Sequence, residues 1–275
     1  MTAAHYAPRS IEFYVRELRF LFEYYPQLSP TEITEAHITQ YMCYVKDVLQ
    51  CGRDKCRGVA QSFSFMWKHV LKQPFILPSK LYPRKQFKLP EVMSQDEVKQ
   101  LLRTPASLKS RTILCFFYST GMRVNEVTHV KFSDIDRANM RIKVTHGKGD
   151  KERFTLLSPV LLQYLEAYYR KFKPVDYIFN GNIKGKKMGD RAMQYIMHKA
   201  INKLGLNVQY SLHSLRHSFA THLLDQGCNI HNIKELLGHS HLQTTMIYLH
   251  LQTHVRQQIV SPLDTLAKQQ STAKQ

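Results

Sequence analysis

Two stretches near the end of the chain decide its fold. Residues 210–222 read YSLHSLRHSFATH, and residues 236–248 read LLGHSHLQTTMIY. Ser211 is a suitable N-cap for a helix that starts the first stretch. That helix has an apolar stripe at helical spacing, made of Phe219, Leu223 and Leu224.

The second stretch predicts two further short helices. One runs from about Ile230 to Leu237 and ends at Gly238, which leaves His239 in a turn. The other is expected to bury a seam made of Leu242, Met246 and Leu249. Tyr248 lies about 100° round from Leu249, so it can project off that seam.

Polar groups recur along these elements in a pattern that favours phosphate chemistry. His213 and Arg216 are three positions apart and share one helix face. Taken singly each residue has an ordinary structural explanation, because the chain has 14 histidines and 15 tyrosines. With His239 and Tyr248 they place two imidazoles, a guanidinium and a phenol on three closely connected elements, which suits a phosphate-centred site.

Another charged pair lies upstream, after an apolar helix that ends at Gly121. Arg123 has apolar neighbours, so it must either pair with an acid or hold an anion. Glu126, one turn further along, is the acid that could pair with it.

A β-hairpin is expected over residues 141–156. Ile142 and Val144 alternate with charged residues, and the sequence GKGD at 147–150 has the chemistry of a turn. Upstream, SQDE at 94–97 has the pattern of a capping box that opens a helix.

Over residues 94–250 these motifs resemble the tyrosine recombinase (phage integrase) family. Its boxes are Gly-x-Arg-x-x-Glu, His-x-x-Arg and Leu-Gly-His, and its nucleophilic tyrosine follows nine residues after the last. The resemblance implies six catalytic residues: Arg123, Lys148, His213, Arg216, His239 and Tyr248. It also implies that Glu126 supports the first arginine. Lys148, in its Gly-Lys-Gly context, would protonate the leaving oxygen, with Lys151 as the alternative.

The chemistry of phosphodiester exchange fits this set. It needs a nucleophile, positive charge at the non-bridging oxygens and an acid for the leaving alkoxide. A phenol has a pKa near 10, so Tyr248 must lose its proton during attack, and His213 is the candidate acceptor. Arg123 and Arg216 offer planar forks for phosphate oxygens. The resemblance adds a hydrogen bond from His239 and a 3′-phosphotyrosyl intermediate, and it implies that no metal, ATP or other cofactor is needed.

Composition narrows the class of partner. Lys and Arg outnumber Asp and Glu by 39 to 21, which gives a net charge of +18 and a pI near 9.7. Such an excess predicts nucleic acid as the first choice of partner and an anionic membrane surface as the second. No apolar run approaches the roughly 20 residues of a membrane span. The five scattered cysteines predict reduced thiols in a cytosolic protein, and their spacing argues against a zinc finger.

The N-terminal part is expected to be helical. One helix breaks at Pro26, the next opens at Ser29 or Thr31, and a third runs over about 53–72 with Val70 facing inward. Basic residues of this part and beyond are candidates for gripping DNA phosphates, or alternatively form a solvated surface. These candidates are Arg53, Lys55, Arg57 and Lys68, with Lys85 in the linker and Lys186 at a basic tip further on.

The predicted fold is therefore mainly α. It has an N-terminal helical-bundle DNA-binding domain (1–72), a basic proline-rich linker (73–93), a C-terminal α+β catalytic domain with a small antiparallel sheet (94–267) and a disordered tail (268–275). By resemblance, the expected function is site-specific recombination of double-stranded DNA, as in integration or excision of mobile DNA. A homo-tetramer on DNA, joined through residues 250–266 and open to accessory DNA-bending proteins, is expected in the bacterial cytoplasm and nucleoid. The rival interpretations are a type IB topoisomerase, a non-catalytic DNA-binding regulator and a metal-dependent nuclease.

Overall fold

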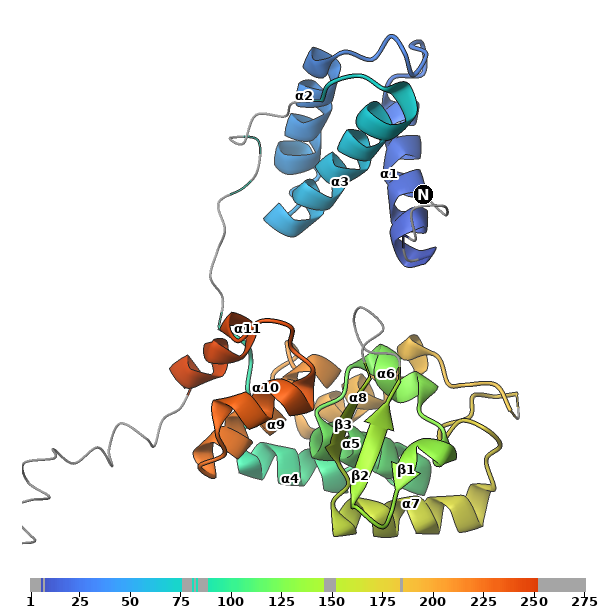
Figure 1. The fold of residues 1–275 in the computed structure, drawn as a ribbon, viewed down its shortest axis with the longest axis vertical. Coiled ribbons are helices and arrows are strands. Elements are labelled where there is room, and N and C mark those ends of the chain that lie inside the picture. The colour runs from blue at the N-terminus through green and yellow to red at the C-terminus, as the bar shows by residue number, and fades with distance from the viewer. Residues whose placement is uncertain are drawn as a thin grey trace, which may run out of the picture. The chain divides into compact units, whose positions relative to one another are not determined.

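The chain divides into two compact units, an N-terminal unit of Met1–Lys88 and a C-terminal unit of Leu89–Gln275. A computed structural model describes residues 6, 8–75, 81, 83, 89–145, 152–183 and 185–251. Figure 1 shows both units; each is taken here by itself. The tail expected at 268–275 and most of 250–266 lie outside the described residues.

The N-terminal unit is a small helical bundle. Its α-helices are α1 (Pro8–Tyr24), α2 (Glu35–Cys43) and α3 (Arg53–Phe65), and α1 packs against α3. Helices α2 and α3 each continue into a π-helical turn, η2 (Tyr44–Val48) and η3 (Met66–Leu71). Its core consists of fully buried apolar side chains, among them Leu21, Ile38, Met42, Val59 and Phe63.

Two details of this unit differ from the prediction. Thr34, not Ser29 or Thr31, caps α2, because its side chain and that of His37 form a reciprocal capping box. Val70 is 62% exposed, so its predicted inward position is wrong. The π-helical turn carries more residues per turn than an α-helix, which shifts the phase of the apolar stripe after Met66.

The C-terminal unit combines a helical core with a three-stranded antiparallel sheet of order β1-β2-β3. The strands are β1 (Ile135–Asp136), β2 (Arg141–Val144) and β3 (Arg153–Leu156), and Ile142 pairs with Thr155 across β2 and β3. A 3-10 turn, η5 (Phe132–Asp134), leads into β1. The predicted hairpin is thus confirmed, and the mainly α fold with a small antiparallel sheet is confirmed with it.

Seven α-helices of the described residues build the rest of this unit. They are α4 (Gln95–Arg103), α5 (Leu108–Thr120), α6 (Val124–His129), α7 (Pro159–Phe172), α8 (Asp190–Leu204), α9 (Leu212–Asp225) and α10 (Ile230–Leu237). Short α11 (Gln243–Met246) and the 3-10 turn η6 (Ile247–Leu251) follow them. Helix α5 packs against both α7 and α9, while α10 contacts β3 (Figure 1).

The helix starts follow local chemistry. Ser94 caps α4 in a capping box with Glu97, and Ser211 caps α9, both as predicted. Helix α5 ends at Gly121 with φ +60°, where an added Cβ would lie 2.4 Å from the Phe219 ring. Glycine is therefore required both for the backbone angle and for the close packing of α9 on this turn.

The predicted seam of the last helix is wrong. Met246 and Leu249 are 44% and 40% exposed, while Thr245 and Tyr248 are buried. The buried pair is three residues apart, which matches the 3-10 geometry that the chain adopts from Ile247 onward. The turn therefore points Tyr248 into the unit, not away from it.

Within the described ranges, no helix is long and apolar enough to cross a bilayer. Nor do three or more histidine, cysteine or acidic side chains of those ranges come together as a metal site.

Candidate active site

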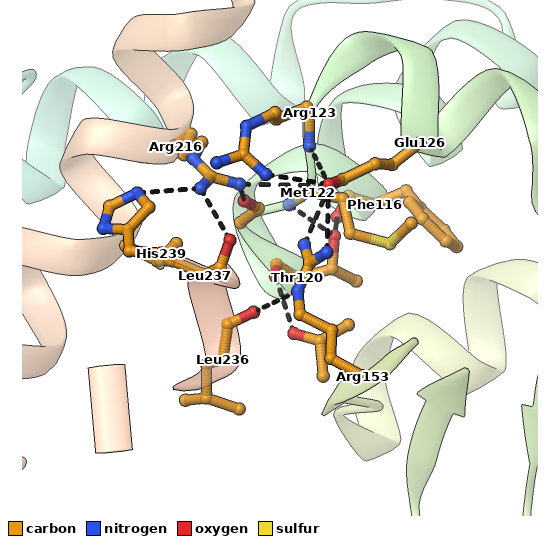
Figure 2. A network of polar contacts seen from close by, with 12 residues as sticks. Phe116, Thr120, Met122, Arg123, Glu126, Arg153, Arg216, Leu236, Leu237 and His239 are labelled. Carbon is orange, nitrogen blue, oxygen red and sulfur yellow. Dashed lines mark hydrogen bonds and ion pairs between the residues drawn. The ribbon is translucent and has the colours of Figure 1, made fainter. Parts of the chain in front are cut away.

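Glu126 is the centre of the polar network drawn in Figure 2. Arg123 is the N-cap residue of α6, and its backbone N–H donates to Glu126 Oε2 at 2.7 Å. The Arg123 side chain donates to the other carboxylate oxygen from Nη1 at 2.9 Å. The Glu126 side chain is 2% exposed, so its charge depends on these partners.

Arg153, from strand β3, binds the same carboxylate with a two-pronged contact. Its Nη1 and Nη2 lie 2.9 and 2.8 Å from the two oxygens of Glu126. Burial alone would raise the pKa of Glu126, but the guanidiniums of Arg153 and Arg123 outweigh burial and hold the pKa below its usual value. The carboxylate is therefore ionised at neutral pH.

Arg216, on α9, completes the arginine–glutamate network of Arg123, Glu126, Arg153 and Arg216. It is 4% exposed and lies 3.9 Å from Glu126 Oε2. Its Nη1 donates to the carbonyl oxygen of Gly121 at 2.7 Å, and its Nη2 donates to that of Leu237 at 2.8 Å. Burial and the charge of Arg123 lower its pKa to about 10, so it stays charged at pH 7.

This network keeps an excess of positive charge. Three guanidiniums meet one carboxylate, which leaves two positive charges uncompensated. Arg123 is the most exposed of the three, with 27% of its side chain accessible, against 10% for Arg153 and 5% for Arg216. The site can therefore hold an anion without bringing in a further cation.

His239 is held in one tautomer in the turn after α10. The Nη2 of Arg216 lies 3.0 Å from its Nε2, and a guanidinium can only donate, so Nε2 accepts. The other ring nitrogen, Nδ1, then carries the proton and donates to Thr245 Oγ1 at 2.9 Å. Burial and the nearby arginines lower the pKa of His239 to about 3, so the ring is neutral. The hydrogen bond to phosphate that the resemblance implies therefore needs this arrangement to change when an anion enters.

Gly238 precedes His239 because nothing larger fits there. Its φ is +65°, and a Cβ at this position would lie 2.8 Å from Cδ of Arg153. The Nε of Arg153 also donates to the carbonyl oxygen of Leu236 at 2.9 Å. Arg153 therefore joins strand β3, the α6 carboxylate and the turn that carries His239 (Figure 2).

Tyr248 lies inside this site, with 2% of its surface exposed. Its ring stacks on His239 at a centroid distance of 6.4 Å and an interplanar angle of 13°. Its hydroxyl lies 3.0 Å from Nδ1 of His217, the residue after Arg216. Burial raises the pKa of Tyr248, and the charges of Arg216 and Arg123 offset this only in part.

His213 lies on the same helix but makes a different contact from the one expected. Its ring centroid is 6.2 Å from that of His217, and it is His217 whose Nδ1 lies 3.0 Å from the Tyr248 hydroxyl. Burial and the positive charges of Arg216 and Arg123 lower its pKa. The side chain that meets the phenol is thus His217, which the sequence motifs did not single out.

The structure brings together five of the six expected catalytic residues, Arg123, His213, Arg216, His239 and Tyr248, with Glu126 among them. Lys148 and Lys151 lie outside the described residues, as does Lys85.

Among the expected DNA contacts, two are engaged inside the protein. Arg53 donates to the carbonyl oxygen of Pro83 at 3.0 Å, and Lys55 pairs with the buried Glu17 at 2.5 Å. The other three described candidates are exposed: Arg57, Lys68 and Lys186.

Arg153 was missed by the motif analysis. The sequence carried no signal for it, because alternation alone would place Phe154 and Leu156 inward, whereas they are 45% and 42% exposed and Arg153 and Thr155 face inward. A strand with polar residues inside and apolar residues outside indicates that its inner face meets a polar site.

Comparison with known proteins agrees with this geometry. Residues 91–254 match the model of the phage integrase family, and residues 1–76 match that of the phage integrase N-terminal SAM-like domain. The chain belongs to the phage integrase family. The expected family, which is that of the tyrosine recombinases, is therefore confirmed.

Individual members of the family are similar over most of the chain. The tyrosine recombinase XerC of Staphylococcus saprophyticus is 32% identical over 84% of this chain and 81% of its own. Two solved structures share the fold. One is the XerH recombinase bound to a palindromic difH substrate, with a TM-score of 0.71 at 24% identity over 88% of this chain and 76% of that one. The other is the Tn1549 transposon integrase with transposon right end DNA, with a TM-score of 0.73 at 13% identity over 98% and 95%.

Proposed function

We propose that this phage integrase family member is a site-specific DNA recombinase that cuts and rejoins strands through Tyr248. The observation that carries the proposal is a buried tyrosine hydroxyl in one site with two histidines and an excess of two guanidinium charges. Family membership and the XerC relative support the same reaction class.

The proposed reaction exchanges one phosphate ester for another. Tyr248 Oη bonds to the scissile phosphorus while the bond from phosphorus to the 5′ oxygen breaks, which gives a 3′-phosphotyrosyl link and a free 5′-hydroxyl. Arg123 and Arg216 bind the non-bridging oxygens and offset the charge that builds up on them. Lys148 supplies the proton to the leaving oxygen, with Lys151 as the alternative. A 5′-hydroxyl from a second duplex then reverses the step and completes strand exchange.

We further propose that Glu126 and Arg153 keep the two phosphate-binding arginines in place. Both belong to the arginine–glutamate network but are mostly buried, so they act through Arg123 and Arg216. His239 is proposed to turn from Arg216 towards the phosphate once the anion is bound.

The wider setting is proposed from the same likeness. The working form is a homo-tetramer on double-stranded DNA, joined through residues 250–266, in the cytoplasm. Its biological outcome is integration or excision of mobile DNA, assisted by DNA-bending proteins.

Replacing the nucleophile tests the proposal. Binding sites are selected from a pool of duplexes with randomised arms, and nicked versions of the selected duplex are incubated with protein. We expect wild type to form a covalent protein–DNA adduct and Tyr248→Phe to form none while binding DNA equally well, because the variant lacks only the hydroxyl. An adduct on Tyr248→Phe, or a wild-type adduct mapped to another residue, would contradict the assignment.

Strand exchange separates recombination from DNA relaxation. Two duplexes that carry the selected site and different end labels should yield hybrid products with wild type. Relaxation of supercoiled plasmid without hybrid products would instead indicate a type IB topoisomerase.

A further inference from the structure

His217 is the side chain that the structure places against the attacking oxygen. It follows Arg216 on α9, about 100° round the helix, so the two project to different parts of the same site. Its Nδ1 lies 3.0 Å from the Tyr248 hydroxyl, with the two ring centroids 5.7 Å apart. This is within the distance that a general base needs to take a proton directly.

The protonation states of the pair fit proton transfer in one direction. Burial, with the charges of His213 and Arg216, lowers the pKa of His217 to about 4, so its ring is neutral at pH 7. Burial raises the pKa of Tyr248, so the phenol keeps its proton. In the tautomer with its proton on Nε2, the neutral His217 accepts the hydrogen bond of the Tyr248 hydroxyl at Nδ1, so the lone pair that would receive the proton faces that hydroxyl.

We propose that His217 accepts the phenolic proton when Tyr248 attacks the phosphate, a role that rests on the proposed function. As the bond from Tyr248 Oη to phosphorus forms, the proton of that oxygen passes to Nδ1 of His217. The bond from phosphorus to the 5′ oxygen breaks, and the general acid protonates that oxygen. In the rejoining step His217 returns its proton to the tyrosine oxygen as the phosphotyrosyl bond breaks.

This assignment gives His213 a different task. His213 is partly exposed, and it lies one turn before Arg216 on α9, on the same helix face as that arginine, which is proposed to bind phosphate. His213 therefore serves as a phosphate ligand beside that arginine, while His217 serves the nucleophile.

The chain offers a matched control for a merely structural role. His222, on the same helix, lies with its Nδ1 2.9 Å from the Tyr118 hydroxyl, and it is 7% exposed. This second histidine–tyrosine pair has nearly the same distances, and the described hydrogen bonds and ion pairs of the arginine–glutamate network do not include either member of it. The effect of losing a buried imidazole can thus be measured in a His222 variant, apart from the effect of losing the proposed base in a His217 variant.

The experiment measures single-turnover adduct formation on the selected nicked duplex. One version of the duplex has the natural 5′ oxygen at the scissile phosphate, and the other has a 5′-bridging sulfur, a leaving group that needs no acid. We expect His217→Ala to slow adduct formation about 100-fold on both versions. His222→Ala should leave both rates within threefold of wild type, although it lowers the temperature of unfolding.

Two further arms separate proton transfer from positioning. Asn at position 217 retains an acceptor near the place of Nδ1 but cannot take the proton, so His217→Asn should be as slow as His217→Ala. Added imidazole should restore adduct formation by His217→Ala, with rates across substituted imidazoles that follow the pKa of the base. Neither imidazole nor its substituted forms should restore adduct formation by His213→Ala.

Three results would overturn the proposal. The first is adduct formation by His217→Ala at the wild-type rate. The second is adduct formation by His217→Asn at the wild-type rate. The third is imidazole rescue of His213→Ala without rescue of His217→Ala. Each is distinct from failure of the proposed function, in which wild type itself would form no adduct on Tyr248.

Discussion

Glu126 shows how a single acidic residue can hold a cationic site together. Its carboxylate is nearly inaccessible and is bonded by two guanidiniums, with a third 3.9 Å away. Without that carboxylate, three arginine side chains would face one another in a region of low dielectric constant. The carboxylate therefore stabilises the site before any phosphate is present.

Glu126→Gln is expected to destabilise the C-terminal unit by about 3 kcal/mol, because it leaves buried guanidiniums uncompensated. Urea unfolding followed by far-UV circular dichroism measures this. Glu152→Gln is the matched control, since Glu152 pairs with Lys143 at 2.9 Å on the surface, with 59% of its side chain exposed. The control should change stability by less than about 0.5 kcal/mol. Equal effects of the two changes would show that the buried carboxylate has no special role.

At the scale of elements, strand β3 and the turn after α10 define the site. Arg153 extends from β3 to both Glu126 and the backbone of Leu236, so the sheet and the last helices are fixed against one side chain. Thr245, from α11, helps to orient His239, because its hydroxyl accepts from the Nδ1 proton that the Arg216 donor at Nε2 imposes. The catalytic side chains are thus oriented by groups that need not touch DNA themselves.

Thr245→Val tests the orientation of His239. The hydroxyl becomes a methyl of similar size, so the ring loses its acceptor, and a proton on Nε2 would instead face the Arg216 donor. We expect a loss of stability of about 1 kcal/mol and slower adduct formation. The ¹⁵N shifts of the His239 ring report the tautomer directly. Thr244→Val, at the exposed neighbouring position, is the control and should alter neither shifts nor rate.

Much of this element structure was predictable from sequence because it depends on local chemistry. The hairpin, the caps at Ser94 and Ser211, and the helix end at Gly238 follow from alternation, hydroxyl caps and glycine. The orientation of Tyr248 was not predictable in this way. Its burial depends on a switch to 3-10 geometry and on polar partners from α9 and α10, which apolar periodicity does not report.

The site residues likewise divide into those that could be predicted from the sequence and those that could not. Arg123, His213, Arg216, His239 and Tyr248 could be found because their motifs have fixed spacing. Arg153 and His217 could not, since one lies on a strand far from any box and the other lies beside a motif residue. Only tertiary contacts distinguish them from ordinary basic residues.

At the scale of the whole molecule, the net charge of +18 is divided between residues that are free to meet DNA and residues already paired. Arg57 is exposed on α3, whereas Lys55 on the same helix bonds the buried Glu17 and lies over the Phe13 ring. A basic residue in a helix is therefore not by itself a phosphate contact.

Arg57→Ala and Lys55→Ala should separate these two roles. We expect Arg57→Ala to weaken DNA binding and to reduce the slope of log K against log salt by about 1, as for one lost phosphate contact. Lys55→Ala should instead lower the unfolding midpoint of the N-terminal unit, because Glu17 loses a partner. Trp67, the chain's single tryptophan, is buried in that unit, so its fluorescence follows this transition alone. An unchanged salt slope in Arg57→Ala would exclude that residue as a DNA contact.

The close packing of Gly238 on Arg153 links two positions that are remote in the sequence. The Cβ of an alanine at position 238 would clash with the Arg153 side chain. A shorter side chain at position 153 would not reach the Glu126 carboxylate. A substitution at either position therefore requires a compensating substitution at the other. In a library randomised at both sites and screened for recombination, survivors should retain the original pair or carry joint replacements.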